Sequence, residues 1–315
     1  MSAALAQVEP VSEFRARLGE CPTWDDGDQC LWWVDIPGHL VLRTTSDGAT
    51  ERLSCPAAPG SLARTTDDRL LVALADGFAI ADPASKQFVR MVDLPHGQDM
   101  MMNDGKCDPS GRFLAGSMNS LGLRYRASLY SLERARLTVL VSGITTSNGL
   151  DWSPDGSTLY YIDSGTRRID AFDYDVATGA VANRRPLHTF DPDLGQPDGL
   201  TVDEEAGIWV TLWGSGRYSR GGGRLVRIAP SGAVDATFLL PTEGSTSCTF
   251  GGAGLRLLYI TTSYEFLTPA ERAQQPLAGR LLAFEPGLAG ARPATRYRAQ
   301  LSAAAPPTAA IPILG

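Results

Sequence analysis

Four residues with oxygen-bearing side chains lie at corresponding distances before short apolar segments of the sequence: Glu20, Asn103, Asn148 and Asp198. Each precedes an apolar residue near the start of its segment by 10 or 11 positions, and each has a glycine within two residues. A glycine there permits a backbone turn that aims the side chain. Two carboxylates and two neutral amides form a hard, dianionic ligand set, which suits one divalent cation. Because histidine and thiolate are missing from the set, we expect Ca²⁺ first, with Mg²⁺, Mn²⁺, Zn²⁺ and Fe²⁺ as alternatives.

The corresponding positions of two further apolar segments hold Gly60 and Ser247. Their small side chains would leave room for water beside a cation. Asn-Gly and Asp-Gly pairs also mark ordinary turns before strands, and this alternative applies to each pair taken singly. Four donors at one shared position of a repeat favour a common site.

The apolar segments are themselves a repeat that must position these donors. A turn followed by a short β-rich segment occurs six times, anchored at Leu31, Leu70, Phe113, Leu159, Ile208 and Leu258, with steps of 39 to 50 residues. An alternating strand pattern and a polar turn follow each segment, over residues 39–52, 77–91, 127–141, 168–185, 223–240 and 279–297. Six units of this length predict an all-β, six-bladed β-propeller, with four-stranded blades around a central channel.

We expect residues 1–302 to form this single propeller domain, and the Ala- and Pro-rich residues 303–315 to form a tail outside the blades. Propellers commonly close by pairing a strand from one end of the chain with the blade made by the other end, and residues 5–8 are the candidate strand. The innermost strands line the channel, so equivalent positions in different blades converge on its axis. The four donors should therefore meet at one rim.

The second strand of each blade should return to the same rim, where the segments after it would surround a pocket. These segments are residues 36–38, 117–126, 164–167, 213–223 and 263–266. The two long segments are candidate lids, and Arg217, Tyr218 and Arg220 are available to meet an anion; an ordinary glycine-rich loop is the alternative. Asp35 and Asp163 occupy equivalent strand ends, where we expect them to accept hydrogen bonds from backbone amides.

Composition and missing motifs narrow the class of function. With 28 Lys and Arg against 35 Asp and Glu, the net charge of −7 argues against a nucleic-acid or membrane partner. The 315 residues contain no apolar run of membrane-spanning length and no amino-terminal signal pattern, which makes a cytoplasmic protein the expectation. The five cysteines form no C-x-x-C pair and are expected to be reduced packing residues. The motifs G-x-S-x-G, H-E-x-x-H and the P-loop do not occur, and none of the three histidines falls at a channel position.

Several longer blocks carry a family resemblance. They read LGECPTWDD, LWWVDIP, MNDGKCDPSGRFLAGSM, SNGLDWSPDGSTLYYIDS, AFDYDVATGAVANRR, PDGLTVDEEAGIWVTLWG and TSCTFGG, and the match runs from about Leu18 to Pro286. Together they resemble the SMP-30/gluconolactonase/regucalcin family. The resemblance implies a six-bladed propeller with one catalytic divalent metal in its channel, which hydrolyses lactones, often of sugar acids; relatives cleave organophosphorus esters. It carries the family's metal ligands onto Glu20, Asn148 and Asp198, with Asn103 as a ligand or substrate contact.

Two positions depart from the pattern of the sugar-lactone members. Many of these carry an arginine two residues before the NDG motif, where this sequence has Met101, and some carry a substrate-binding glutamate in the loop before SLYSL, where it has Leu123. Both changes make the expected pocket more apolar, so a less polar lactone stands beside a sugar-acid lactone as the expected substrate. Simple packing is the alternative role for Met101. The expected substrate contacts are Asn103, Met101, Leu123 and Trp213.

These observations lead to the hypothesis that the protein is a lactonase with a metal-assisted mechanism. The cation would polarise the carbonyl oxygen and stabilise the tetrahedral oxyanion. Asp198 would take a proton from the attacking water, with Asp104 as an outer alternative, while Asn103 completes the coordination or orients the small-molecule lactone. Two other functions stay open: hydrolysis of phosphotriesters at the same site, and a metal-binding propeller without catalysis. The sequence has no dimer motif and therefore assigns no oligomeric state.

Overall fold

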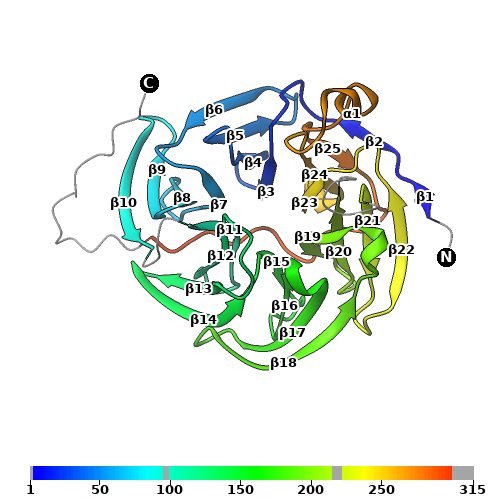
Figure 1. Cartoon of the computed structure of the whole chain (residues 1–315). Helices are drawn as coiled ribbons and strands as arrows, with labels where there is room; N and C mark the ends of the chain where they lie inside the picture. Colours follow the sequence, from blue (N-terminus) through cyan, green and yellow to red (C-terminus); the bar gives the residue numbers. More distant parts are fainter. Residues whose placement is uncertain (1–2, 95–98, 215–221, 300–315) are drawn as a thin grey trace.

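Six sheets surround a central channel, so the predicted six-bladed β-propeller is confirmed (Figure 1). All their strand pairs are antiparallel except that of the short edge strand β1 with β22. The computed structural model describes residues 3–94, 99–214 and 222–299. From the channel outward, blade one consists of β3 (Gly19–Asp25), β4 (Cys30–Asp35), β5 (Leu40–Thr45) and β6 (Thr50–Ser54). Blade two consists of β7 (Pro59–Arg64), β8 (Leu70–Leu74), β9 (Gly77–Asp82) and β10 (Gln87–Asp93). Blade three consists of β11 (Met100–Cys107), β12 (Phe113–Asn119), β13 (Ala127–Glu133) and β14 (Arg136–Ile144).

The remaining blades repeat this arrangement. Blade four consists of β15 (Ser147–Trp152), β16 (Thr158–Asp163), β17 (Arg168–Asp175) and β18 (Ala180–Thr189). Blade five consists of β19 (Gln196–Val202), β20 (Ile208–Trp213), β21 (Arg224–Ile228) and β22 (Val234–Leu239). Short helical turns lie in the connections: η1 (Ser164–Thr166), η2 (Pro192–Leu194), η3 (Ala253–Leu255) and α1 (Pro269–Gln274).

Blade six is completed by a strand from the amino-terminal part of the chain. β2 (Val8–Pro10) pairs antiparallel with β25 (Leu282–Phe284), outside β24 (Leu257–Thr262) and β23 (Ser245–Gly251). β1 (Ala4–Leu5) pairs with β22 of blade five instead. The predicted closing strand, residues 5–8, is therefore displaced by a few residues. The predicted strand pattern over residues 279–297 is wrong beyond Phe284, because β2 occupies the outer edge of this blade.

The hydrophobic core lies between neighbouring blades. On β4, Leu31 and Trp33 pack with residues of blade six, whereas Trp32 and Val34 on the opposite face pack with residues of blade two. Successive side chains of a strand point to opposite faces, so a strand covered on both faces is apolar at nearly every position. This packing explains the uninterrupted apolar segments of the repeat. The five cysteines are free and buried, as expected.

The segment 289–298 closes the end of the channel opposite the predicted rim, and Figure 1 shows it crossing behind the ring. It forms hydrogen bonds with all six blades, at the ends of inner strands or in the turns that follow them. The amides of Gly290, Ala291, Tyr297 and Arg298 donate to the carbonyls of Leu255, Val202, Arg64 and Gly111 at 2.8–3.1 Å, and the side chains of Arg292 and Arg296 reach Trp152 and Asp25. The rim where the inner strands begin is therefore the open end.

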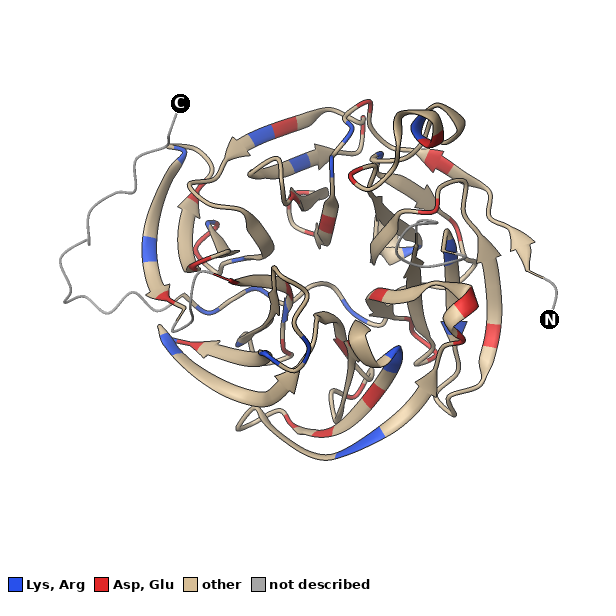
Figure 2. Cartoon of the chain, in the orientation of Figure 1, with Lys and Arg blue, Asp and Glu red and all other residues tan. Residues whose placement is uncertain are grey.

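Some of the features predicted from the sequence lie outside the residues that the structure describes, and others are not tested by the structure. The tail 303–315 lies outside the described residues, as do Arg217, Tyr218 and Arg220 of the loop 213–223. Within the described ranges, no helix has both the length and the apolar character needed to cross a membrane. Acidic and basic residues are interspersed along the outer strands (Figure 2). The cytoplasmic location and the lack of a nucleic-acid partner stay predictions.

Candidate metal centre

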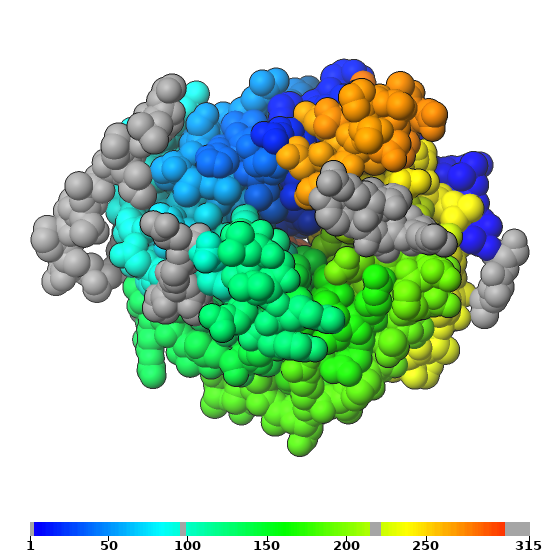
Figure 3. Space-filling model, viewed as in Figure 1, coloured from blue at the N-terminus to red at the C-terminus, as the bar shows by residue number. Residues whose placement is uncertain are grey.

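A cavity of about 430 Å³ lies at the end of the channel where the inner strands begin. Glu20, Asn103, Asn148 and Asp198 all line it, each from the innermost strand of a different blade. The first three are only 6–7% exposed. A hollow is visible near the centre of this face of the molecule (Figure 3). The structure thus brings together the four donors that the repeat had singled out, and we refer to them as the cage.

A β-bulge or similar irregularity near the start of each inner strand sets the direction of these side chains. In blades three, four and five, two bulged residues lie opposite one residue of the second strand, and a cage residue is the first of each pair: Asn103, Asn148 and Asp198. In blade one the irregularity begins directly after Glu20, where Cys21 has a φ of 47°. Bulges are frequent next to active sites because they re-aim a side chain. Here they allow the cage residues to face the cavity.

Two buried aspartates, Asp35 and Asp163, hold the chain at the start of two inner strands. The hydrogen bonds run to Asp35 from the amides of Arg17 and Leu18 (3.0 and 3.1 Å), and to Asp163 from those of Thr145 and Thr146 (3.1 and 3.0 Å). The expected bonding to backbone amides is confirmed. Since these amides lie just before Glu20 and Asn148 in the chain, the two aspartates position two members of the cage.

The two asparagines of the cage are oriented by a chain of hydrogen bonds. Asn103 Nδ2 donates to the Ser147 carbonyl and to Asn148 Oδ1, at 2.7 and 2.9 Å. Asn148 Nδ2 donates to Ser164 Oγ at 2.7 Å, and that hydroxyl donates to the Pro197 carbonyl at 2.6 Å. Because the Ser164 hydroxyl gives its one proton to Pro197, it can only accept from Asn148. The chain therefore leaves Asn103 Oδ1, together with the second lone pair of Asn148 Oδ1, available to a cation.

Ser164→Ala is expected to weaken divalent-cation binding about tenfold while the blades stay folded. Without the hydroxyl, Asn148 Nδ2 loses its acceptor and the amide can rotate away from the cage. Calorimetric titration with Ca²⁺ or Mn²⁺ measures the change. Ser110→Ala is a matched control, because its hydroxyl also donates to a backbone carbonyl (Val176, 2.8 Å) but lies at the closed end of the channel. An unchanged dissociation constant in Ser164→Ala would contradict the orienting role.

The carboxylates of the cage repel one another in the absence of a cation. Burial raises the pKa of Glu20 well above its ordinary value, and the nearby carboxylates of Asp198 and Asp104 raise it further. Burial and the charge of Asp104 also raise the pKa of Asp198. Oδ1 of Asp198 is buried and has no hydrogen-bond partner among the described residues. A divalent cation would offset the repulsion and give that oxygen a partner, so the residues present fit such an ion.

Asp104 lies beside the cage but is not among the described residues that line the cavity. Its carboxylate accepts a hydrogen bond from the amide of Gly105 at 2.8 Å. Burial raises the pKa of Asp104 to about 6, against the opposing effect of Lys106. Lys106 in turn pairs with Asp151 at 2.9 Å, toward the closed end of the channel. This position suits an outer role for Asp104, which stays a prediction.

All five segments that were expected to surround the pocket contribute to its lining. They supply Ile36, Pro37, Met118, Ser120, Ser164, Trp213, Glu265 and Phe266. Of the expected substrate contacts, Met101, Asn103 and Trp213 line the cavity. Leu123 is not among the lining residues and is 52% exposed on the loop after β12, so its contact with substrate stays a prediction.

Ser164 and Met118 lie in segments predicted to surround the pocket but had no individual role in that prediction, and Gln196 was not part of it; all three line the cavity. Ser164 directly follows Asp163, and Gln196 lies two residues before Asp198. Alignment of the six repeats around the cage positions would have shown both as neighbours of the site. Nothing in the sequence distinguishes Met118 from the other apolar residues of its strand.

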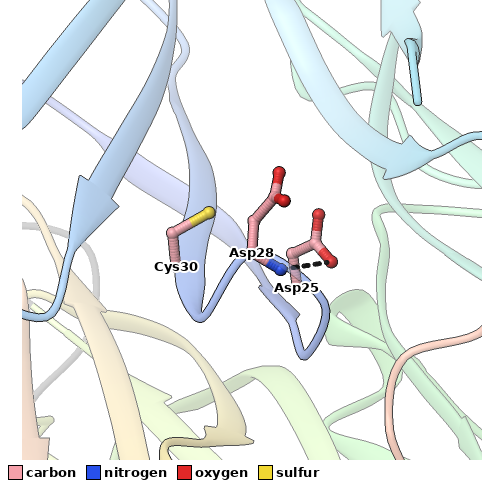
Figure 4. A group of neighbouring side chains, drawn as sticks. All are labelled: Asp25, Asp28 and Cys30. Atoms are coloured by element: carbon pink, nitrogen blue, oxygen red, sulfur yellow. Dashed lines mark hydrogen bonds between the residues drawn. The ribbon is translucent and has the colours of Figure 1, made fainter.

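A second group of acidic residues lies near the closed end of the channel, around Asp25, Asp28 and Cys30 (Figure 4). Arg64 Nε donates to Asp25 at 2.7 Å, and Arg296 donates to its other oxygen at 3.0 Å. Burial alone would raise the pKa of Asp25, but the two arginines outweigh it and lower the pKa. Because guanidinium groups already neutralise these carboxylates, we assign this group a structural role.

The fold and the cavity together define a class: a six-bladed β-propeller with a cage of oxygen donors at the open end of its channel. Residues 18–264 match the family model described as the SMP-30/Gluconolactonase/LRE-like region. The chain belongs to this family, as its sequence blocks had indicated.

Three known proteins illustrate the relationship. Regucalcin of Danio rerio is 36% identical over 279 residues, which cover 87% of this chain and 92% of that protein. A Bacillus subtilis (strain 168) protein with the provisional name sugar lactone lactonase YvrE is 34% identical over 288 residues, which cover 90% of this chain and 96% of that protein. The solved structure of regucalcin from Agrobacterium tumefaciens, described as a calcium-binding protein, matches with a TM-score of 0.88 at 24% identity, and covers 95% of this chain and 100% of that chain.

Proposed function

We propose that this protein is a divalent-cation-dependent hydrolase that opens a lactone ring. The observation that carries the proposal is the cage itself: four oxygen donors line one cavity, and a buried oxygen of Asp198 has no partner among the described residues. Membership of the family supports hydrolysis of lactones, as does the name of the Bacillus subtilis relative. The metal dependence and the roles of the residues are our own inference.

Glu20, Asn148 and Asp198 would hold the cation, and Oδ1 of Asn103 would complete its coordination or orient the substrate. When bound, the cation supplies Lewis-acid polarisation of the lactone carbonyl. A donor set made only of oxygen atoms favours Ca²⁺, with Mg²⁺, Mn²⁺, Zn²⁺ and Fe²⁺ as alternatives.

Asp198 would accept the proton of the attacking water, because its carboxylate lines the cavity and has a second oxygen for this purpose. The hydroxyl of the water stays on the acyl carbon, and the bond between the acyl carbon and the ring oxygen breaks. The proton then passes from Asp198 to the ring oxygen, which leaves as an alcohol of the same molecule. Asp104 is the alternative base, reached through one intervening water.

Removal of the cation by a chelator is expected to abolish lactone hydrolysis, and one restored metal should return it. The assay uses aldonolactones, an alkyl lactone and a dialkyl aryl phosphotriester, with Ca²⁺, Mg²⁺, Mn²⁺, Zn²⁺ and Fe²⁺ restored separately. Preferred turnover of the phosphotriester would replace the lactonase assignment by a phosphotriesterase. Tight metal binding without turnover of any substrate would replace it by a binding protein.

A further inference from the structure

The wall of the cavity above the cage differs from one side to the other. On the side of blades four and five, the wall carries hydrogen-bonding groups from Thr146, Ser164 and Gln196. On the side of blades one to three, the wall is apolar except for Ser120, whose hydroxyl donates to the Asp99 carbonyl at 3.1 Å. The apolar side consists of Leu18, Ile36, Pro37, Met101 and Met118. Aliphatic and thioether side chains offer dispersion contacts but no hydrogen bonds to a ligand, apart from the weak acceptor of the methionine sulfur.

An aromatic pair extends the apolar surface around the rim. Trp213 and Phe266 also line the cavity, and their rings meet edge to face with centroids 5.5 Å apart at an angle of 79°. Phe266 is 40% exposed despite this contact. An aromatic ring at the mouth of a cavity, held by a second ring, is suited to cover an apolar group of a ligand.

Among the lining residues that the structure describes, none beyond the cage carries a free charge. Glu265 lines the cavity, but its carboxylate accepts two hydrogen bonds from Arg17, at 2.9 and 2.7 Å. Among the described lining residues there is no lysine, arginine or histidine. A phosphate or carboxylate group on a substrate would therefore find no cationic side chain on the described wall.

We propose that the substrate is a lactone with an uncharged apolar substituent, which packs against the apolar side while the ring carbonyl faces the cage. The inference rests on the proposed function and specifies its substrate class. Each ring hydroxyl of a sugar lactone that turned to this side would lose its hydrogen bonds to water without replacement. An alkyl chain has no such loss, and the two methionines can adapt to its shape.

The test is a series of δ-lactones whose alkyl substituent grows from methyl to heptyl, compared with glucono-δ-lactone under the same metal. We expect kcat/KM to rise about threefold for each added methylene until the chain fills the cavity. We also expect glucono-δ-lactone to be turned over at least tenfold less efficiently than the best alkyl lactone. A preference for glucono-δ-lactone, or rates independent of chain length, would overturn the inference.

Variants connect the chain-length effect to this wall. Met118→Gln is expected to reduce the gain per methylene, because it places an amide on the apolar side at nearly constant volume. Val139→Ala is a matched control, since Val139 is a 53% exposed apolar residue on the outer strand β14. This variant should retain the wild-type dependence of kcat/KM on the length of the alkyl chain. An equal loss of chain-length dependence in both variants would contradict the proposal that the apolar side of the cavity binds the alkyl substituent.

A binding measurement separates this inference from the proposed function. Six-membered lactams with the same alkyl substituents are resistant to hydrolysis, and their affinities are measured by calorimetry. If no lactone is turned over with any metal, the proposed function fails, and the lactam series alone decides the chemistry of the cavity. Affinity that rises with chain length supports the apolar subsite; affinity independent of chain length refutes it.

Discussion

Asp198→Asn is expected to lower lactone turnover about a thousandfold or more while the propeller stays folded. The substitution removes one of the two anionic donors of the cage and the candidate base, but it keeps the shape of the side chain. The wild-type carboxylate is half-buried near Asp104 and Glu20, and its buried Oδ1 has no hydrogen-bond partner in the described structure. Steady-state kinetics at saturating metal measure the loss, and circular dichroism checks the fold.

Thermal unfolding tests the same residue without any assay of activity. In the cation-free protein the charge of Asp198, with one buried oxygen and Asp104 nearby, opposes folding, so the variant should be at least as stable as the wild type. A cation at a hundredfold excess over its Kd stabilises the wild type by about 2.7 kcal/mol, a rise in Tm of about 4 °C. The variant should show little of this rise. Asp193→Asn is the control, because it removes an exposed carboxylate shortly before β19. Wild-type turnover or a wild-type Tm shift in Asp198→Asn would refute its assignment.

The cage could be predicted from the sequence because the repeats of a propeller become blades arranged around one axis. Equivalent positions of the six apolar segments converge on one axis, so Glu20, Asn103, Asn148 and Asp198 could be grouped without knowledge of any contact. The bulges that aim them could not be found in this way. The register of two strands depends on their pairing along the whole ladder, and a bulge leaves no fixed residue type in the sequence.

Other features depend on contacts between segments that the repeat does not relate. The hydroxyl of Ser164 orients Asn148 because it also reaches the carbonyl of Pro197 in the next blade. The alternating pattern over residues 279–297 predicts an outer strand, but the segment 289–298 forms no strand in the structure. It is held instead by hydrogen bonds to every blade. Only the three-dimensional arrangement shows that β2 already occupies that edge.

The glycines beside the cage have a different role from the one expected. The sequence predicts that they permit backbone turns, for which glycine is favoured where φ is positive. Neither Gly149 nor Gly199 has a positive φ. A Cβ atom at Gly149 would lie 2.5 Å from the Leu200 amide nitrogen of the next inner strand, and one at Gly199 would lie 2.5 Å from Ser247 Cα. These glycines are required because neighbouring inner strands approach closely around the axis.

Gly199→Ala is therefore expected to cost about 3 kcal/mol of unfolding free energy and to weaken cation binding at least tenfold. The added methyl group would overlap with the side chain and the Cα of Ser247, so β19 and β23 must separate. Asp198 precedes this residue directly and its carboxylate would move with the strand. Urea denaturation measures the first effect, and calorimetric titration with Ca²⁺ or Mn²⁺ measures the second.

Gly143→Ala separates loss of stability from distortion of the cage. Gly143 lies on the outer strand β14 with a φ of 72°, and a Cβ atom there would meet nothing within 4 Å. Alanine should cost about 1 kcal/mol through backbone strain alone and leave the Kd for the cation unchanged. If Gly199→Ala also kept the wild-type Kd, the cage would tolerate displacement of its inner strand. Close packing of the inner strands would then not be what sets the positions of the donors.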